Sequence, residues 1–300
     1  MPLLGAVAAL IGIGALWGLG APLVRLARLD GVSALTVIFS QSFVSVLVMA
    51  AILALRGRLN LPLDRASLLL YLAVGLLGIV LPHMAGYFAL GYIPAGIHAM
   101  LTSLVPMFAL ALALGLKIER FEPMRGIGLA LGAGAVMVLV WPDAALPGSV
   151  PVVFVLLSAL APLCYALESA FVAHYSRASA GAMQALLGGS VVAVLVMAPI
   201  TLLAGAPLYP TGSGVIVAAV LGAGLAATFA YAGYVMLLRH AGSVFATQVA
   251  YLVTGWAMLW SVLLLGERHG PLVWLALGLL FAGLFLVQPR PRLPASEPLR

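Results

Sequence analysis

Ten apolar runs, each about 18–25 residues long, follow one another along the 300-residue chain. Within a bilayer the backbone must satisfy its own hydrogen bonds, so such runs cross only as helices or as strands of a closed barrel. A barrel strand needs only about 10 residues of alternating character, whereas these runs have the length of a helix. Charged residues make up 7% of the chain and hydrophobic residues 64%. The sequence therefore predicts an all-α integral membrane protein and excludes a soluble domain.

The runs predict ten transmembrane helices. Pro123 and Pro271 each open a run, at a position where the missing N–H costs a helix nothing. The predicted spans cover residues 4–25, 33–55, 67–90, 95–116, 123–141, 149–173, 181–203, 213–238, 243–265 and 271–288.

The basic residues between the spans predict the orientation, because cytoplasmic loops are enriched in Lys and Arg. With the N-terminus inside, 11 of the 14 basic residues are cytoplasmic, and Arg25, Arg28 and Arg268 are outside. The first span alone favours the opposite orientation, since it has no basic residue before it and two just after it. The distribution of basic residues over all loops outweighs this signal from the first span. We therefore expect both termini inside (N-in/C-in), with no cleavable signal peptide.

The two halves of the chain align with a shift of 148 residues. Residues 119–123, ERFEP, then fall on residues 267–271, ERHGP, and each pentad lies between two apolar runs. We predict a first five-helix repeat at 1–146, a second at 147–288 and a short disordered cytoplasmic tail at 289–300. Five is an odd number, so the second repeat must cross the membrane upside down. Inverted repeats are typical of secondary transporters, whose substrate site lies near the midplane between the repeats.

Four short motifs carry a resemblance to a known family. They are ALWG at 15–18, YIPAG at 92–96, LVP at 104–106 and LGER at 265–268. In order and spacing the chain resembles the drug/metabolite transporter superfamily, in particular its ten-helix EamA-type exporters. Two departures stand out: residues 115–119 are GLKIE where the family usually has Leu-Gly-Glu, and the second copy lacks a proline to match Pro106.

The resemblance implies a multi-pass exporter of small metabolites in the inner (plasma) membrane, with amino acids prominent among its substrates. It also implies that spans 1, 3, 4, 6, 8 and 9 line the transport cavity. The branch that fits best is the YddG-type exporters of neutral and aromatic amino acids. The function expected is secondary transport by alternating access, and not enzymatic activity.

Polar groups inside the spans are the candidates for a substrate site, because they are costly there. The repeat places Trp17 over Tyr165 and His83 over Tyr231, each pair near the midplane. The predicted substrate-binding residues are Trp17, His83, Tyr87, His98, Thr102, Tyr165, Tyr231, Gln248 and Tyr251. Packing competes with substrate contact for Trp17 and Tyr165, and a hydrogen bond between helices competes for His83.

Glu168 is the one acid well inside a span, and Glu168 and His83 are candidates for proton coupling. A paired or snorkelling carboxylate is the alternative for Glu168. The predicted cavity contains no fixed positive charge, so we expect a zwitterionic or neutral small molecule. An ammonium can rest on aromatic faces, and a carboxylate can take neutral donors. Cationic drugs and other metabolites are the alternative substrates.

Other functions leave no comparable pattern in the sequence. We find no metal-binding motif, no nucleophile elbow and no phosphate-binding loop, so neither a metal nor a cofactor is predicted. The basic loops are expected to face anionic lipid, and no nucleic-acid partner is predicted. A channel or a lipid scramblase stays an alternative, and monomer and homodimer both fit. Prolines 22, 82, 106, 162 and 199 are expected to kink their spans.

Overall fold

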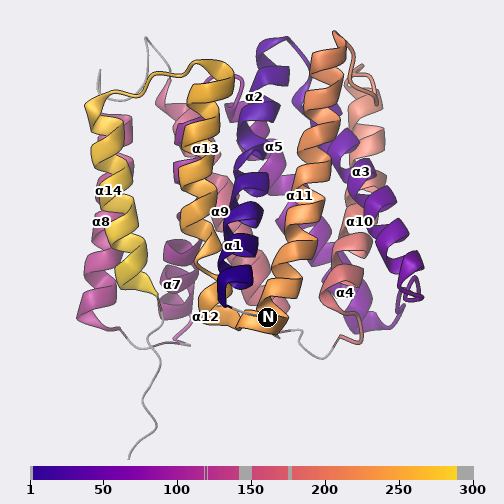
Figure 1. Ribbon diagram of the computed structural model, residues 1–300, viewed down its shortest axis with the longest axis horizontal. Coiled ribbons are helices and arrows are strands. Elements are labelled where there is room, and N and C mark those ends of the chain that lie inside the picture. Colours follow the sequence, from indigo (N-terminus) through magenta and orange to yellow (C-terminus); the bar gives the residue numbers. More distant parts are fainter. Residues whose placement is uncertain (1–2, 118, 120, 142–150, 175–177, 289–300) are drawn as a thin grey trace, which may run out of the picture.

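The structure is a computed structural model that describes residues 3–117, 119, 121–141, 151–174 and 178–288. In these ranges the chain folds into helices and contains no strand. The helices run side by side along one axis, and the N-terminus lies at one end of the bundle (Figure 1). We call this the N-terminal end and the opposite one the far end. The predicted tail at 289–300 lies outside the described residues.

The observed helices follow the predicted spans closely. Eight are long and apolar enough to cross a membrane, and two shorter apolar helices complete the ten spans. Their bounds are α1 Leu3–Gly18, α2 Gly20–Leu29, α3 Ala34–Leu55, α4 Arg65–Gly75, the π-helical turn η1 Leu76–Val80, α5 Leu81–Ala89, α6 Ala95–Thr102, α7 Val105–Gly115, α8 Pro123–Val140, α9 Val152–His174, α10 Ala182–Leu203, α11 Gly214–Ala241, α12 Ser243–Ala246, α13 Val249–Leu265 and α14 Pro271–Val287. The all-α, ten-span prediction is confirmed.

Four spans are interrupted along their length. Helices α1 and α2 meet at Leu19, and η1 separates α4 from α5. The fourth span breaks at Ser103 and Leu104, and the ninth breaks at Thr247 and Gln248. All four interrupted spans contribute to the cavity described below.

Proline accounts for three of these interruptions, because it lacks the N–H that would bond the carbonyl four residues earlier. Each proline leaves one carbonyl without that bond. Pro22 does so for Gly18, Pro82 for Gly78 and Pro106 for Thr102. Pro162 and Pro199 lie inside the continuous helices α9 and α10, since membrane helices tolerate proline where neighbouring groups compensate.

The packing of the helices follows the internal repeat. Helix α1 packs on α11 and α13, and its counterpart α9 packs on α5, α6 and α7. Helix α3 packs on α11, and its counterpart α10 packs on α4. In three further contacts, α3–α10, α6–α13 and α8–α14, a helix packs on its own counterpart in the other repeat. Helices that are 148 residues apart in the sequence therefore make equivalent contacts in the two halves. The two-repeat architecture is confirmed.

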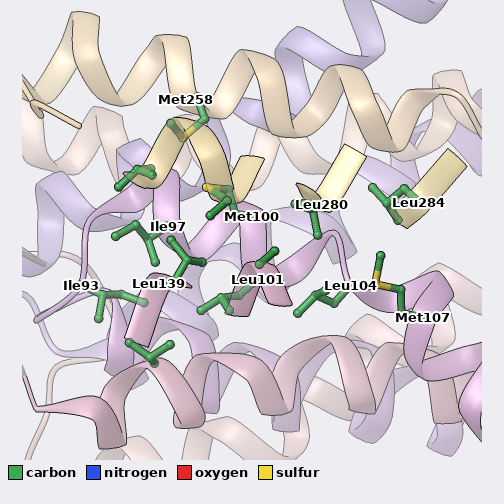
Figure 2. Packing of buried hydrophobic residues seen from close by; sticks show 14 of the residues in the cluster. Ile93, Ile97, Met100, Leu101, Leu104, Met107, Leu139, Met258, Leu280 and Leu284 are labelled. Carbon is green, nitrogen blue, oxygen red and sulfur yellow. The ribbon is translucent and has the colours of Figure 1, made fainter. Parts of the chain in front are cut away.

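A core of large apolar side chains attaches the pair α8–α14 to the rest of the bundle (Figure 2). Met100 and Leu101 of α6 and Met258 of α13 pack here with residues of α7, α8 and α14. Helices α8 and α14 approach closely at two glycines. A Cβ built on Gly128 would lie 2.8 Å from the Gly283 carbonyl oxygen, and one on Gly283 would lie 2.8 Å from that of Gly128. Such backbone contact is a common source of helix association in membranes.

Asp64 fixes the start of α4 at the N-terminal end. Its Oδ1 accepts the Ser67 N–H at 3.0 Å, and its Oδ2 accepts the hydroxyls of Ser67 at 2.7 Å and of Ser179. These hydrogen bonds, the one from Ser179 foremost, lower the pKa of Asp64 from 3.8 to about 2. The carboxylate thereby ties the loop before α4 to the segment before α10.

Candidate substrate cavity

A cavity of about 750 Å³ lies between the two repeats. Every span except the peripheral α8 and α14 contributes to its wall. The lining residue Thr247 is exposed and directly follows α12, which lies at the N-terminal end (Figure 1), so the cavity extends in that direction. Its volume lies within the range of small-molecule sites, about 300–1,000 Å³.

Eight of the residues predicted from the sequence line this cavity. They are Trp17, His83, Tyr87, His98, Thr102, Tyr165, Glu168 and Tyr231. They come from α1, α5, α6, α9 and α11, which belong to both repeats. The pairs related by the repeat, Trp17 with Tyr165 and His83 with Tyr231, therefore meet around one space.

Gln248 and Tyr251 lie outside the cavity wall, contrary to the prediction. The residues of α13 that do line it are Val249, Ala250, Val253, Thr254 and Ala257, spaced by three or four residues along one face. Tyr251 lies off that face: its hydroxyl accepts a hydrogen bond from Gln288 Nε2 at 3.2 Å, and its ring meets Phe281 edge-on. Gln248 Nε2 donates to Gln288 Oε1 at 3.4 Å. The break at Thr247 and Gln248 falls about one turn before the position that the repeat predicts, which changes the residues presented to the cavity.

Spans 2 and 7 also line the cavity, which neither the residues nor the resemblance indicated. Gln41, Ser42 and Ser45 come from α3 and Ser190 from α10, with Ser190 donating to Ser45 Oγ at 3.0 Å. Gln41 could have been identified from the sequence, because it is an amide within an apolar run. A polar group inside a membrane span is a candidate site residue by default.

Glu168 is the only acid among the described lining residues, which include no Lys or Arg. Its carboxylate lies against η1, where a Cβ on Gly78 would be 2.9 Å from Glu168 Cδ. Within the described part of the chain it makes no hydrogen bond or ion pair. An unpaired charge at membrane depth costs roughly 2.5–3.5 kcal/mol. A bound cation or a proton would remove that cost.

Backbone carbonyls and aromatic rings add to the cation-binding character of the wall. The three residues whose carbonyls lose the usual helical bond to a proline nitrogen, Gly18, Gly78 and Thr102, all line the cavity. The rings of Trp17 and Tyr234 lie 5.6 Å apart, with Tyr234 also in the wall. Carbonyl oxygens accept hydrogen bonds from an ammonium, and aromatic faces attract it.

The two histidines of the cavity differ in their partners. His98 Nδ1 shares a hydrogen bond of 2.8 Å with Ser158 Oγ, and the Thr102 hydroxyl donates to the His98 carbonyl at 2.9 Å. The His83 ring stacks on Tyr87 with 4.6 Å between centroids. His83 Nδ1 is buried without a hydrogen-bond partner among the described residues. The other ring nitrogen of His98, Nε2, lies 3.5 Å from Thr102 Oγ1, so among the described residues His83 is the histidine of the cavity whose ring has a nitrogen without a partner.

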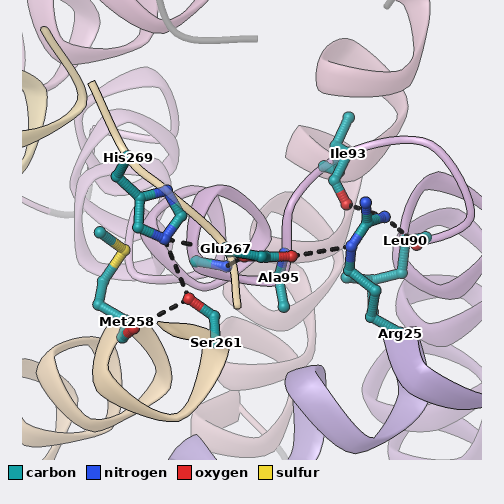
Figure 3. A network of polar contacts seen from close by, with 9 residues as sticks. Arg25, Leu90, Ile93, Ala95, Met258, Ser261, Glu267 and His269 are labelled. Carbon is teal, nitrogen blue, oxygen red and sulfur yellow. Dashed lines mark hydrogen bonds and ion pairs between the residues drawn. The ribbon is translucent and has the colours of Figure 1, made fainter. Parts of the chain in front are cut away.

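At the far end of the bundle the two repeats are joined by charged side chains (Figure 3). Arg25 of α2 pairs with Glu267, which follows α13, at 2.8 Å between Nε and Oε1. The contact is an ion pair and not a hydrogen bond, because the Nε–H does not point at the carboxylate. Arg25 Nη1 donates to the carbonyls of Leu90 at 2.8 Å and Ile93 at 2.6 Å. The Arg25 and Glu267 side chains are only 14% and 9% exposed.

Glu267 also holds the start of α6. It accepts the N–H of Ala95 at 2.8 Å and that of Gly96 at 3.4 Å, a favourable position for a negative charge. His269 Nε2 lies 3.0 Å from Ser261 Oγ and 3.8 Å from Glu267 Oε2. Burial lowers the pKa of His269, and Glu267 acts in the opposite direction. These contacts join α2, α6 and α13 at the far end.

Among the described residues, the N-terminal end has no equivalent ion pair at the corresponding position. Glu119 is the counterpart of Glu267 under the 148-residue shift. It pairs with Arg125 of its own repeat, and its side chain is 39% exposed. The two ends of the bundle therefore differ: at this position the far end has an ion pair between the repeats, and the N-terminal end has one within a single repeat.

The fold and the cavity define a class: an integral membrane protein of ten spans in two related halves, with a polar cavity between them, as in secondary transporters. The sequence profile of the EamA-like transporter family matches residues 3–141 and again residues 152–288. The chain therefore belongs to the EamA-like transporter family, and it is a multi-pass membrane transporter and not an enzyme.

Two further comparisons concern individual proteins. No curated protein matches the chain. A protein of known crystal structure aligns over 93% of this chain and 96% of its own, with a TM-score of 0.65 and 19% sequence identity. At that identity the likeness shows a shared fold alone.

Proposed function

We propose that this transporter exports small metabolites that carry an ammonium group, chiefly neutral and aromatic amino acids. The observation that carries the proposal is Glu168, an unpaired carboxylate in a cavity wall without Lys or Arg. Trp17, Tyr165 and Tyr234 line the same space and offer aromatic faces to the substrate side chain. An anion without a compensating ammonium would have no charged partner here. The YddG-type branch of the family agrees with this chemistry.

The proposed mechanism is alternating access between the repeats. With the N-terminus in the cytoplasm, as the basic loops predict, the cavity extends toward the cytoplasm of the inner membrane. The contacts of Arg25 and Glu267 then close the outer end. Export requires these contacts to break after the substrate binds, while the cytoplasmic end closes. Because the repeats are inverted, the same packing is available to either end.

Glu168 also supports a second candidate, the export of organic cations without a carboxylate. Such a substrate and a proton would compete for the same carboxylate, which makes Glu168 the first choice for proton coupling. His83 is the second choice, since its Nδ1 is free of protein partners in the described structure. Transport that does not respond to a pH gradient would remove both residues from this role.

Uptake into proteoliposomes tests the proposal. The labelled substrates are an aromatic, an aliphatic, an anionic and a cationic amino acid, each with and without a pH gradient. We expect saturable uptake of the aromatic and aliphatic substrates and weakening by Trp17→Ala. Non-saturable flux would indicate a channel, and flip of labelled lipid in place of solute uptake would indicate a scramblase.

A further inference from the structure

We propose that His269 is a proton-binding site that opens the far end of the transporter when the solution at that end becomes acidic. A proton on His269 places a second cation beside Glu267 and so weakens the contact between Glu267 and Arg25 that joins the repeats. The inference rests on the proposed function, because it takes alternating access and the N-in orientation from there. His269 does not line the cavity, so this site is separate from the candidates for proton coupling inside it.

The hydrogen bonds of Ser261 assign the hydrogen of the neutral His269 ring (Figure 3). The Ser261 hydroxyl donates its single hydrogen to the Met258 carbonyl at 2.9 Å. His269 Nε2, 3.0 Å from Ser261 Oγ, is then the donor in the second contact. The other nitrogen, Nδ1, has no hydrogen-bond partner in the described part of the chain and keeps some contact with solvent. Nδ1 is therefore the atom that takes up a proton.

The ring of His269 is enclosed in the structure, where the far end is closed. Its side chain is only 2% exposed. The start of α6 covers the ring, since a Cβ on Gly96 would lie 3.0 Å from Nε2, and the Trp274 ring of α14 meets it edge-on at 6.4 Å. Burial lowers the pKa of His269 from 6.5, and Glu267 at 3.8 Å offsets this only in part. The closed arrangement therefore favours the neutral ring.

The charged and titratable groups around His269 are few. Arg25 of α2 lies 2.8 Å from the other oxygen of Glu267. On α6, His98 faces the cavity instead, and Arg268 is adjacent in the chain and exposed. Helices α13 and α14 contain no acid, no base and no histidine. A proton on His269 thus meets one carboxylate, and that carboxylate already has a cationic partner.

Opening of the far end changes the surroundings of His269 in one direction. Glu267 and His269 are two residues apart and move together with the second repeat, while Arg25 moves with the first. In the open arrangement His269 gains water, and Glu267 no longer shares its charge with Arg25, so the pKa of His269 is higher there. Tighter proton binding by the open arrangement shifts the equilibrium toward it as the pH falls below about 6.5. Each unit of difference in pKa changes the population ratio by up to about tenfold.

The first repeat has no such group. The 148-residue shift aligns His269 with Phe121, which is 67% exposed and cannot take up a proton. The acid response therefore belongs to the far end alone. With the N-terminus inside, a more acidic exterior holds the transporter open to the outside, where the substrate leaves and protons enter the cavity.

Distances between two spin labels measure the opening of the far end without transport. In the Cys164→Ser background, Leu29→Cys labels α2 and Leu264→Cys labels α13, both at exposed positions. Pulsed EPR in lipid nanodiscs compares about pH 7.5 with about pH 5.5, the range in which histidine titrates. We expect the population with the longer distance to grow several-fold at the lower pH. His269→Gln keeps an N–H donor for Ser261 but takes up no proton, so its distances should not respond to pH.

His240→Gln is the matched control, because this histidine is exposed and ends α11 at the N-terminal end, so the pH response should remain. A full pH response in His269→Gln would assign the response to His83, His98 or Glu168 and overturn the proposal. Identical distances at both pH values with His269 in place would overturn it as well. Phenylalanine added at constant pH tests the proposed function separately: distances that do not respond to it contradict the proposed substrate class, whatever the pH series shows.

Discussion

Arg25 Nε lies 2.8 Å from Glu267 Oε1, and this ion pair joins the first repeat to the second at the far end of the bundle. Both side chains are largely buried; Arg25 Nη1 donates to two backbone carbonyls, and Glu267 accepts two backbone N–H groups. Breaking such a pair leaves a buried charge without a partner, at a cost of about 3–5 kcal/mol. The pair therefore stabilises the arrangement in which the far end is closed.

Glu267→Gln should destabilise this closed arrangement by roughly 3 kcal/mol, because Arg25 loses its counter-charge. Thermal unfolding of the purified protein should show a clearly lower midpoint. The control is Glu119→Gln, the same change in the other repeat, where the side chain is 39% exposed and a small effect is expected. Equal midpoints for Glu267→Gln and the wild type would contradict a structural role of the pair.

Glu168→Gln should weaken the binding of ammonium-bearing substrates about tenfold or more, since the only carboxylate in the described wall is lost. It should also remove any response of transport to a pH gradient. Calorimetry and proteoliposome uptake measure the two effects separately. Glu122→Gln, a change of an exposed acid outside the cavity, is the control. Full binding by Glu168→Gln would rule out the ammonium site.

Asp64 should make stability depend on pH in the acid range. Its pKa in the folded protein, about 2, lies below the ordinary value of 3.8. The stabilisation is therefore fully present above about pH 4 and is lost as the pH falls toward 2. In Asp64→Asn this part of the pH dependence should be absent. Unfolding midpoints of the two proteins, measured from pH 5 to 2.5, should converge as the pH falls, and a constant difference would show that Asp64 does not titrate as stated.

Pro82→Ala should impair transport without harming the fold. The N–H introduced at position 82 can bond the Gly78 carbonyl, which straightens η1 and changes the wall of the cavity at Gly78. We expect an unchanged or higher unfolding midpoint together with a several-fold lower uptake rate. Pro199→Ala, within a continuous helix away from the cavity wall, is the matched control. Equal uptake by Pro82→Ala and the wild type would argue against a role for this π-helical turn.

The spans and the repeat could be predicted from the sequence because bilayer thickness fixes the length of an apolar helix, and a shift of 148 residues preserves the pattern. The repeat also predicted that Trp17 and Tyr165 lie near one another, and both line the cavity. It misplaced Tyr251, because the ninth span breaks about one turn earlier than its counterpart and the face of α13 rotates. Gln41 was missed since its counterpart at position 189 is a glycine, so symmetry gave no indication of it.

Protection of a cysteine in the cavity tests the central claim that this space binds the transported substrate. The background variant is Cys164→Ser, which removes the single native cysteine. Ala227→Cys then places a thiol on the part of α11 that lines the cavity. Substrate in the cavity should slow the reaction of this thiol with a bulky maleimide in proportion to its occupancy, and the labelled protein should no longer transport. Unchanged labelling at saturating substrate, with transport intact after labelling, would place the substrate site elsewhere.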